Sequence, residues 1–292
     1  MFWQTARHRI DLSQPRVMGI VNVTPDSFSD GGQLATTRDA VAHCLRLIEE
    51  GADLLDIGGE STRPGAAPPG DETELARVLP VLREALALGV PVSVDTSSPR
   101  VMAQALALGA DIINDIRALR TPGALACLAA HPLAGVCLMH MKGEPAHMQA
   151  QAGYFDVVAE VCEFLRSRIQ ATRDAGVAAA RIVVDPGIGF AKTDDHNLAL
   201  LLRQDHLAAL GQPVLVGWSR KGTLGRITGR AVGSRIGASL AAAVLAVQRG
   251  ASIVRVHDVA ATVDALKVWQ AASLPNGGSS SRMGPQSRLT RP

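Results

Sequence analysis

One pattern repeats eight times between residues 17 and 272: a short apolar run, a polar or glycine-rich turn, then an amphipathic helix. Short apolar runs that alternate with helical periodicity are typical of buried parallel strands joined by crossover helices. The expected strands cover 17–21, 54–57, 91–94, 111–113, 135–139, 182–184, 214–216 and 252–258. The expected helices cover 38–50, 71–88, 99–108, 122–130, 156–175, 194–210, 235–248 and 259–272.

Strict alternation of eight strand–helix units favours a closed parallel barrel, the (β/α)8 TIM barrel, over an open doubly wound sheet. An open sheet usually has fewer strands and carries G-x-G-x-x-G after its first strand, and that sequence does not occur here. We therefore predict an α/β protein with a single barrel domain at 17–272. Residues 1–16 are expected to form an extension, as a hairpin or a plug. The Gly-, Ser-, Arg- and Pro-rich residues 273–292 are predicted to be a disordered tail.

The composition argues against several classes of partner. A net charge of +2 over 292 residues, without a basic run along the body, predicts neither a nucleic-acid groove nor a membrane-surface patch. The chain has no apolar run of membrane-spanning length and no apolar signal segment near its start. Scattered cysteines in apolar surroundings predict free core thiols of a cytoplasmic protein rather than disulfides or metal ligands. These cysteines are Cys44, Cys127, Cys137 and Cys162.

Polar side chains recur at the carboxyl ends of the expected strands. The last strand ends in Arg255 and His257, whose spacing of two residues places both on one face. A guanidinium beside an imidazole suits a phosphate-like anion, and a surface ion pair with Asp258 is the alternative for this stretch. Over the whole chain, the polar residues at strand ends are Asn22, Thr62, Arg63, Asp95, Asn114, Asp185, Lys221, Arg255 and His257.

Each of these residues has a simpler alternative role, because Asp and Asn often cap helices or form turns and Lys221 suits a solvated loop. Their recurrence favours one recognition site on the carboxyl rim, where barrel enzymes place their chemistry. The residues suited to a heterocycle with N–H donors and a ring carbonyl are Asp95, Asn114 and Asp185. The residues suited to an anion are Asn22, Arg63, Arg255 and His257, and Lys221 lies between the two groups.

Two further expectations concern loops and histidines. Residues 22–32 contain small, polar and glycine residues and are expected to form a loop that closes over a substrate. The histidines without metal spacing are interpreted as surface or local-structure residues: His43, His131, His147, His196 and His206.

Eight short motifs, in order over residues 17 to 272, resemble those of the dihydropteroate synthases. Two are long: residues 22–32 (NVTPDSFSDGG) and residues 56–65 (DIGGESTRPG). The others are residues 94–96 (VDT), 112–116 (IINDI), 138–141 (LMHM), 185–187 (DPG), 219–221 (SRK) and 255–258 (RVHD). Any one of the short motifs is weak, but eight in register are specific.

The resemblance implies a (β/α)8 transferase that joins a dihydropterin diphosphate to 4-aminobenzoate, giving dihydropteroate and pyrophosphate in folate biosynthesis. It implies that sulfonamides mimic the aminobenzoate, that Mg²⁺ is bound by Asn22 and that the chain is a homodimer. The residues expected at the pterin are Asp95, Asn114, Asp185 and Lys221, and Met139 and Gly217 are expected to contact substrate. Those expected at the diphosphate are Thr62, Arg63, Arg255 and His257, and those flanking the aminobenzoate are Pro64, Phe190, Ser219 and Lys221. The residues expected to be catalytic are Arg63, Asp95, Asp185, Lys221, Arg255 and His257.

Three positions depart from the family pattern. Ile188 stands where many relatives carry an aromatic residue and Ala191 where Gly is common, both near the expected aminobenzoate pocket. Ser98 stands where Lys is frequent, outside the expected site. A pterin-binding methyltransferase acting on methyltetrahydrofolate, or a non-catalytic relative, are the alternatives. The anion-binding motifs at 56–65 and 255–258 favour the synthase over both.

Overall fold

The computed structural model describes residues 1–23, 37–60 and 69–273. Within this part of the chain, eight parallel strands close into a barrel in the order β10-β3-β4-β5-β6-β7-β8-β9, which confirms the predicted fold. The strands are β3 (Arg16–Asn22), β4 (Leu54–Gly58), β5 (Val92–Asp95), β6 (Ile112–Asp115), β7 (Gly135–Met139), β8 (Ile182–Asp185), β9 (Val214–Val216) and β10 (Ala251–Val256).

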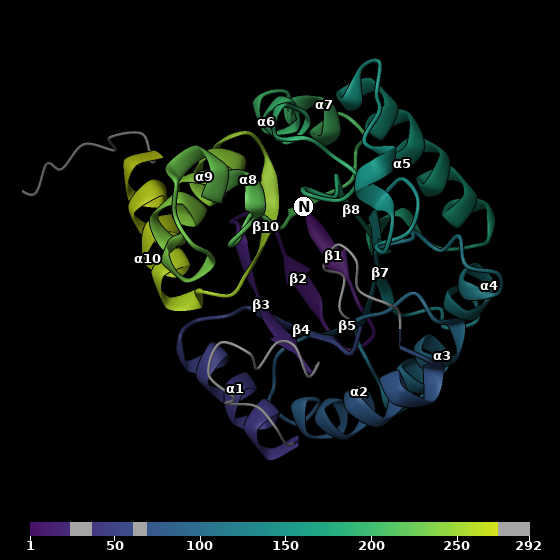
Figure 1. Cartoon of the computed structure of the whole chain (residues 1–292). Helices are drawn as coiled ribbons and strands as arrows, with labels where there is room; N and C mark the ends of the chain where they lie inside the picture. The colour runs from purple at the N-terminus through teal and green to yellow at the C-terminus, as the bar shows by residue number, and fades with distance from the viewer. Residues whose placement is uncertain (24–36, 61–68, 274–292) are drawn as a thin grey trace, which may run out of the picture.

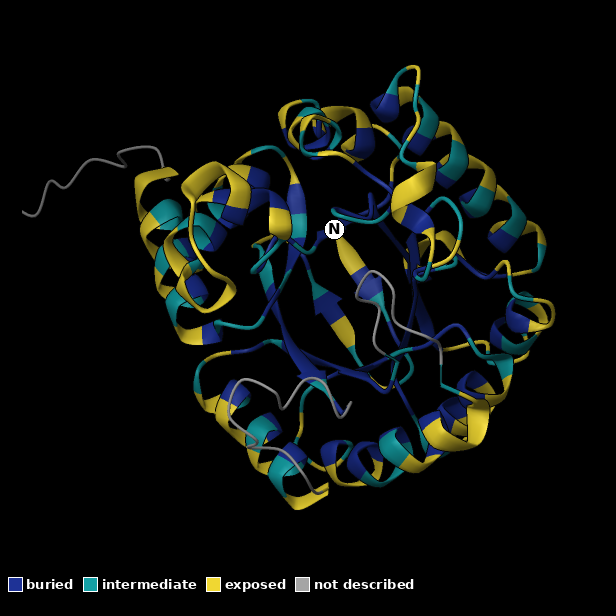
Figure 2. Cartoon of the chain, in the orientation of Figure 1, coloured by how far each residue is buried: buried dark blue, intermediate teal, exposed yellow. Residues whose placement is uncertain are grey.

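Helices surround the barrel as an outer ring (Figure 1). They are α1 (Thr37–Glu49), α2 (Asp71–Ala85), α3 (Pro99–Leu108), α4 (Ala124–Ala129), α5 (Val157–Asp174), α6 (Asp194–Leu202), α7 (Asp205–Ala208), α8 (Gly222–Thr228), α9 (Ile236–Gln248) and α10 (Val259–Ser273). Short 3-10 turns cover η2 (Met148–Gln151), η3 (Ala179–Arg181) and η4 (Val232–Ser234). The helices turn an apolar face inward, so buried and exposed residues alternate along them (Figure 2).

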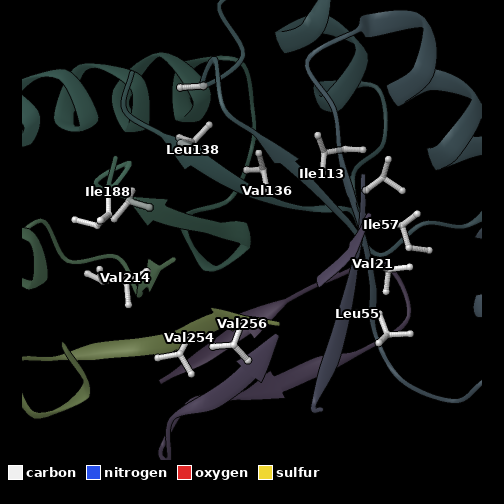
Figure 3. Close-up of a cluster of buried hydrophobic side chains, with 14 of the residues drawn as sticks. Val21, Leu55, Ile57, Ile113, Val136, Leu138, Ile188, Val214, Val254 and Val256 are labelled. Carbon is white, nitrogen blue, oxygen red and sulfur yellow. The ribbon is translucent and has the colours of Figure 1, made fainter. Parts of the chain in front are cut away.

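The main hydrophobic core lies between the barrel wall and the helices. Alternate residues of each strand point outward, and they are mostly β-branched or leucine, which suits strands buried on both faces. Ten of these side chains and neighbours are labelled in Figure 3: Val21, Leu55, Ile57, Ile113, Val136, Leu138, Ile188, Val214, Val254 and Val256.

A second, smaller core fills the amino-terminal end of the barrel. Residues 1–16 form the expected hairpin, in which β1 (Phe2–Gln4) pairs antiparallel with β2 (Arg9–Asp11). Trp3 is fully buried and its Nε1–H donates to the carbonyl of Arg181 at 2.9 Å. The cluster consists of Trp3, Ile10, Leu12, Met18, Leu54, Ile112, Cys137, Val183, Leu215 and Ile253. The hairpin is therefore also a plug, and ligands reach the barrel from the opposite end.

Two helical expectations were wrong. The single helix expected at 194–210 is divided into α6 and α7, because the Gln204 side chain between them turns inward and donates to the carbonyl of Ala246 at 2.8 Å. Helix α8 was missed, since Gly222 and Gly225 lower the helical propensity of its sequence.

All four cysteines are free thiols, as expected. Among the described residues, no helix has the length and apolar character that crossing a bilayer requires.

Candidate functional site

A pocket of about 890 Å³ opens at the carboxyl ends of the strands. Every second residue of a strand points into the barrel. The first inward residues form the apolar core at the plugged end, and the next inward residues of each strand form a layer nearer the pocket. This upper layer is mostly polar. The inward strand-end residues that line the pocket are Ile20, Asn22, Asp95, Asn114, Met139, Asp185, Gly217, Arg255 and His257. The predicted convergence of strand ends on one cavity is thus present, with Asp185 and Arg255 in the same pocket.

Arg255, on β10, is held between two carboxylates from strands β4 and β5, which lie beyond β3 in the barrel. Its Nε donates to Asp56 at 2.6 Å, and its terminal nitrogen donates to Asp95 at 2.9 Å. The amide of Asn114 donates to the same oxygen of Asp56 at 3.1 Å. Burial opposes the charge on Arg255, but the carboxylates of Asp56 and Asp95 outweigh it and raise the pKa of Arg255. The guanidinium is therefore a fixed, permanently charged part of the pocket wall.

Two carboxylates in the pocket ionise less readily than usual. Burial raises the pKa of Asp95 to about 8, with Arg255 acting against the shift and Asp56 adding to it. Burial raises the pKa of Asp185 to about 6, opposed by the backbone N–H of Gly187, which donates to it at 2.7 Å. A ligand that donates N–H groups to these oxygens would favour their charged forms.

Lys221 is not the solvated loop lysine of the alternative reading. Its ammonium lies 4.5 Å from the centroid of the Phe190 ring, and both residues line the pocket. Burial lowers the pKa of Lys221 to about 8, with the charge of Asp185 acting against the shift. The side chain therefore has an anionic group and an aromatic face as its neighbours.

His257 is a neutral hydrogen-bond donor in this structure. Nδ1 lies 2.9 Å from the hydroxyl of Ser219, which also accepts the backbone N–H of His257 at 3.1 Å. In the tautomer that carries the ring proton on Nε2, the Ser219 hydroxyl donates to Nδ1 and the Nε2–H is available to a ligand. Burial, with help from Arg220 and Arg255, lowers the pKa of His257 to about 3. Asp258 forms its ion pair with Arg220 at 2.7 Å, so the surface pair considered for the end of β10 is not the arrangement found.

The sequence grouped Arg255 with the anion-binding residues and apart from the acids, but in the structure its guanidinium donates to the acids Asp56 and Asp95. Local sequence gives the identity of each strand end but not which opposite charges meet across the closed barrel.

The histidine interpretation is confirmed at three positions with local bonds: His43 to the carbonyl of Ile20, His131 to that of Cys127, and His196 in the capping box of α6.

One wall of the pocket is apolar and rich in methionine. Ile116, Met139, Met148 and Phe190 line it, and Met141 and Ala191 belong to the same buried cluster. Ile188, which replaces the common aromatic residue, is 2% exposed and lines the pocket. Ala191 has a φ of 51°, in the left-handed region where a β-carbon is strained, which explains why Gly is common there. A flat ring system fits such a wall better than a branched one.

The metal expectation rests on Asn22, at the end of β3. Its amide lines the pocket together with the carboxylates of Glu60 and Asp95. Among the described residues no group of three or more His, Cys, Asp or Glu could hold an ion. Mg²⁺ commonly uses one or two protein oxygens and takes its other ligands from water and substrate phosphates. The residues present therefore fit a magnesium ion that arrives with a phosphorylated ligand, rather than a closed protein site.

Some expected site residues cannot be placed. Thr62, Arg63 and Pro64 lie outside the described residues, as does most of the loop at 22–32, so their roles stay predictions. Two residues were missed by the sequence reasoning. Asp56 interrupts the apolar strand β4 at an inward position, which was the available signal. Lys192 lines the pocket but follows a strand by seven residues, so no strand-end pattern included it.

Residues 18–257 match the family described as pterin binding enzyme. The class of pterin-binding enzymes agrees with a parallel barrel whose carboxyl-end pocket is lined by acids, an amide and a fixed guanidinium. The chain is 51% identical over 278 residues to a dihydropteroate synthase of Neisseria meningitidis, covering 93% of this chain and 98% of that protein. Within the class, the chain belongs to the dihydropteroate synthases.

Solved structures agree with this family. A Xanthomonas albilineans dihydropteroate synthase with 4-aminobenzoic acid has a TM-score of 0.86 and 54% identity, covering 91% of this chain and 96% of that one. A structure of the enzyme from the same organism in complex with 7,8-dihydropteroate has a TM-score of 0.86 and 51% identity, covering 94% and 100%. The resemblance of the sequence motifs and the predicted fold are both confirmed.

Proposed function

We propose that this chain joins (7,8-dihydropterin-6-yl)methyl diphosphate to 4-aminobenzoate, giving 7,8-dihydropteroate and pyrophosphate. The observation that carries the proposal is the ring of Asp95, Asn114, Asp185, Lys221 and Arg255 around one pocket. That ring offers acceptors for a heterocycle's N–H groups, an amide that both donates and accepts, and donors for a ring carbonyl. Membership of the dihydropteroate synthases and the ligands named for the two Xanthomonas structures support it.

The pterin is expected to lie against the inner layer. Asp95 and Asp185 accept N–H groups of the ring, Asn114 pairs with its edge, and Lys221 donates to an oxygen or ring nitrogen. Met139 and Gly217, also at strand ends, border the same space. Both carboxylates have raised pKa values because burial removes water from their charged forms. Hydrogen bonds from the ligand's N–H groups would replace that water and stabilise the charged forms.

The reaction requires the diphosphate to leave before or as the amine attacks. The carbon–oxygen bond breaks with its electron pair on the departing oxygen, and the pterin ring delocalises the positive charge. Arg255 and the Nε2–H of His257 stabilise the developing anion, with Thr62 and Arg63 as further predicted contacts. Mg²⁺ held at Asn22 would supply additional positive charge at the diphosphate. Asp95 and Asp185 stabilise the cationic ring.

The amine of 4-aminobenzoate then forms the carbon–nitrogen bond and releases one proton to water. Phe190, Ser219 and Lys221 border the expected aminobenzoate position, and Pro64 is predicted beside them. The aromatic face of Phe190 and the ammonium of Lys221 suit a ring that carries a carboxylate. No side chain forms a covalent intermediate in this scheme.

The remaining proposals concern setting and assembly. We propose that residues 17–272 are the catalytic unit, that the enzyme acts in the cytoplasm, where its free thiols remain reduced, and that sulfonamides compete with aminobenzoate. Helices α9 and α10 lie side by side and expose Ile236, Leu245 and Val268, which supports a homodimer through this face.

The test is pyrophosphate release from the dihydropterin diphosphate, measured with and without 4-aminobenzoate. We expect release that depends on the aminobenzoate and formation of dihydropteroate in equal amount. Methyl transfer from methyltetrahydrofolate without pyrophosphate release would support the alternative, and inactivity with both substrates would support a non-catalytic relative.

A further inference from the structure

Lys192 is a buried lysine in the turn after β8 that the proposed mechanism does not use. The residue is 3% exposed and lies on the border of the pocket. Its ammonium donates to the carbonyl of Phe190 at 2.9 Å and to Nδ1 of His140 at 3.0 Å, with the carbonyl of His140 at 3.5 Å. The three hydrogens of the ammonium therefore have three acceptors, from two separate segments of the chain.

His140 is suited to the role of an acceptor. The ring is buried at the end of β7 and packs edge-on against Phe164, with 4.8 Å between the ring centroids. Burial, together with the charges of Lys192 and Lys142, lowers the pKa of His140 to about 2. The imidazole is therefore neutral, and Nδ1 carries a lone pair toward Lys192 while the proton resides on Nε2. Burial lowers the pKa of Lys192 to about 7, with the charge of Asp185 acting against the shift, and the three contacts to Phe190 and His140 fix where the side chain lies.

The turn that Lys192 holds is unusual in its backbone. Gly187, Gly189 and Ala191 have φ values of 69°, 83° and 51°, all in the left-handed region. Other side chains hold its inner peptide groups, because Gln149 donates to the carbonyl of Gly189 at 3.0 Å and Asn197 accepts the Gly189 N–H at 2.8 Å. Lys192 adds the bond between the Phe190 carbonyl and the end of β7.

We propose that Lys192 is a positioning residue for the aminobenzoate subsite: by tying the carbonyl of Phe190 to His140, it sets where the Phe190 ring stands beside Lys221. The inference rests on the proposed function, in which Phe190 flanks the aminobenzoate. Asp185, which begins the same turn, is held by its own strand and by the Gly187 N–H. Loss of Lys192 therefore affects the aminobenzoate side of the pocket more than the pterin side.

The test is Lys192→Met, which keeps the aliphatic stem and removes the donors, with Arg173→Met on the exposed face of α5 as control. We expect KM for 4-aminobenzoate to rise about tenfold or more, because misplaced binding groups cost one to two orders of magnitude. Two quantities should change less than about threefold: kcat, and the Kd for the dihydropterin diphosphate measured without aminobenzoate. A raised KM with an unchanged kcat is expected when a variant weakens binding equally in the ground state and the transition state. Arg173→Met should match the wild type.

A second pair of variants decides the question if Lys192→Met does not fold. His140→Leu removes the acceptor and should raise the aminobenzoate KM as Lys192→Met does. His140→Asn presents an oxygen near the position of Nδ1 and should recover most of the loss. Equal KM values in the two His140 variants would overturn the proposal, as would an unchanged aminobenzoate KM or an equal rise for both substrates in folded Lys192→Met. Absence of aminobenzoate-dependent pyrophosphate release from the wild type would instead reject the proposed function.

Discussion

Nε of Arg255 lies 2.6 Å from the carboxylate of Asp56, which is completely buried in the barrel. The two residues are 199 positions apart in the chain and meet because β10 and β4 flank β3 in the closed sheet. The same guanidinium donates to Asp95 at 2.9 Å. A single cation thereby orients two acids, and Asp56 holds its guanidinium in place.

Asp56→Asn should lower kcat/KM for the pterin substrate by about 10²-fold, as expected when a preorganised charge loses its orientation. Arg255 and Asn114 donate to the same oxygen of Asp56, and an amide oxygen can still accept both bonds, so the substitution removes the negative charge that holds the guanidinium. Steady-state pyrophosphate release measures the effect. Asp53→Asn is the matched control, because Asp53 pairs with Arg16 at the opposite end of the barrel and should affect stability without changing kinetics. Rates for Asp56→Asn within threefold of the wild type would contradict the positioning role.

Arg255→Ala and His257→Ala should each lower turnover by about 10²-fold or more, because each removes a donor aimed at the departing diphosphate. Arg255→Ala should also destabilise the fold, since it leaves two buried carboxylates without their cation. Initial rates and denaturant unfolding separate the two effects. Arg16→Ala serves as a control for the loss of a half-buried arginine away from the site. Unchanged rates in both site variants would reject the diphosphate role.

The rate should decline in acid because of Asp185. Burial raises the folded pKa of Asp185 to about 6 from 3.8. The carboxylate that accepts pterin N–H groups is therefore mostly ionised only above about pH 6. We expect kcat/KM for the pterin substrate, which reports on the free enzyme, to fall as the pH drops below about 6. Between these two pH values the folded state binds more protons than the unfolded state, so this group lowers stability as the pH rises.

Asp185→Asn provides the control for this profile, because the terminal phosphate of the substrate also ionises in weak acid. The variant should be slow and should lack the part of the acid limb that belongs to Asp185. An acid limb of the same midpoint and slope in Asp185→Asn would show that Asp185 does not set the limb and would assign it to Asp95 or to the substrate phosphate.

Gly187→Ala should destabilise the protein by about 3 kcal/mol or more, from the combined strain of a left-handed residue and an overpacked contact. Gly187 has a φ of 69°, and a β-carbon there would lie 2.0 Å from the carbonyl oxygen of His140. Gly211 has a φ of 77° with nothing within 4 Å, so Gly211→Ala carries the backbone strain without the clash. It should cost about 1–2 kcal/mol. Equal losses in chemical denaturation would show that the contact with His140 is unimportant.

Trp3→Ala should cost about 3–5 kcal/mol of unfolding free energy, the usual loss for emptying a buried aromatic site. Trp3 is fully buried against the lower inward layer and donates to the carbonyl of Arg181. The neighbouring Phe2 is 43% exposed, so Phe2→Ala should cost far less. Both variants should retain wild-type kcat/KM well below their unfolding temperatures, because the plug lies at the end of the barrel away from the pocket. A fall in kcat/KM for folded Trp3→Ala would show that the plug also shapes the site.

Much of the architecture was readable from local patterns. The expected strands at 135–139 and 214–216 and the helix at 99–108 have the bounds found in the structure. Boundaries failed where a long-range contact overrides propensity, as at Gln204 between α6 and α7, or where glycines obscure a short helix, as in α8. The pocket residues at strand ends were found because alternation along a strand is a local property.

The amino-acid sequence by itself determined that eight buried strands alternate with helices, and that their carboxyl ends carry acids, amides and cations. Only the tertiary structure decided that Arg255 bonds to Asp56 and Asp95, that His257 is neutral, and that Lys192 is enclosed by acceptors. The reason is physical: strand and helix patterns depend on neighbours in the chain, whereas ionisation and charge pairing depend on burial and distance. Burial and distance are set when barrel closure brings together residues far apart in the chain, such as Arg255 and Asp56, which are 199 positions apart.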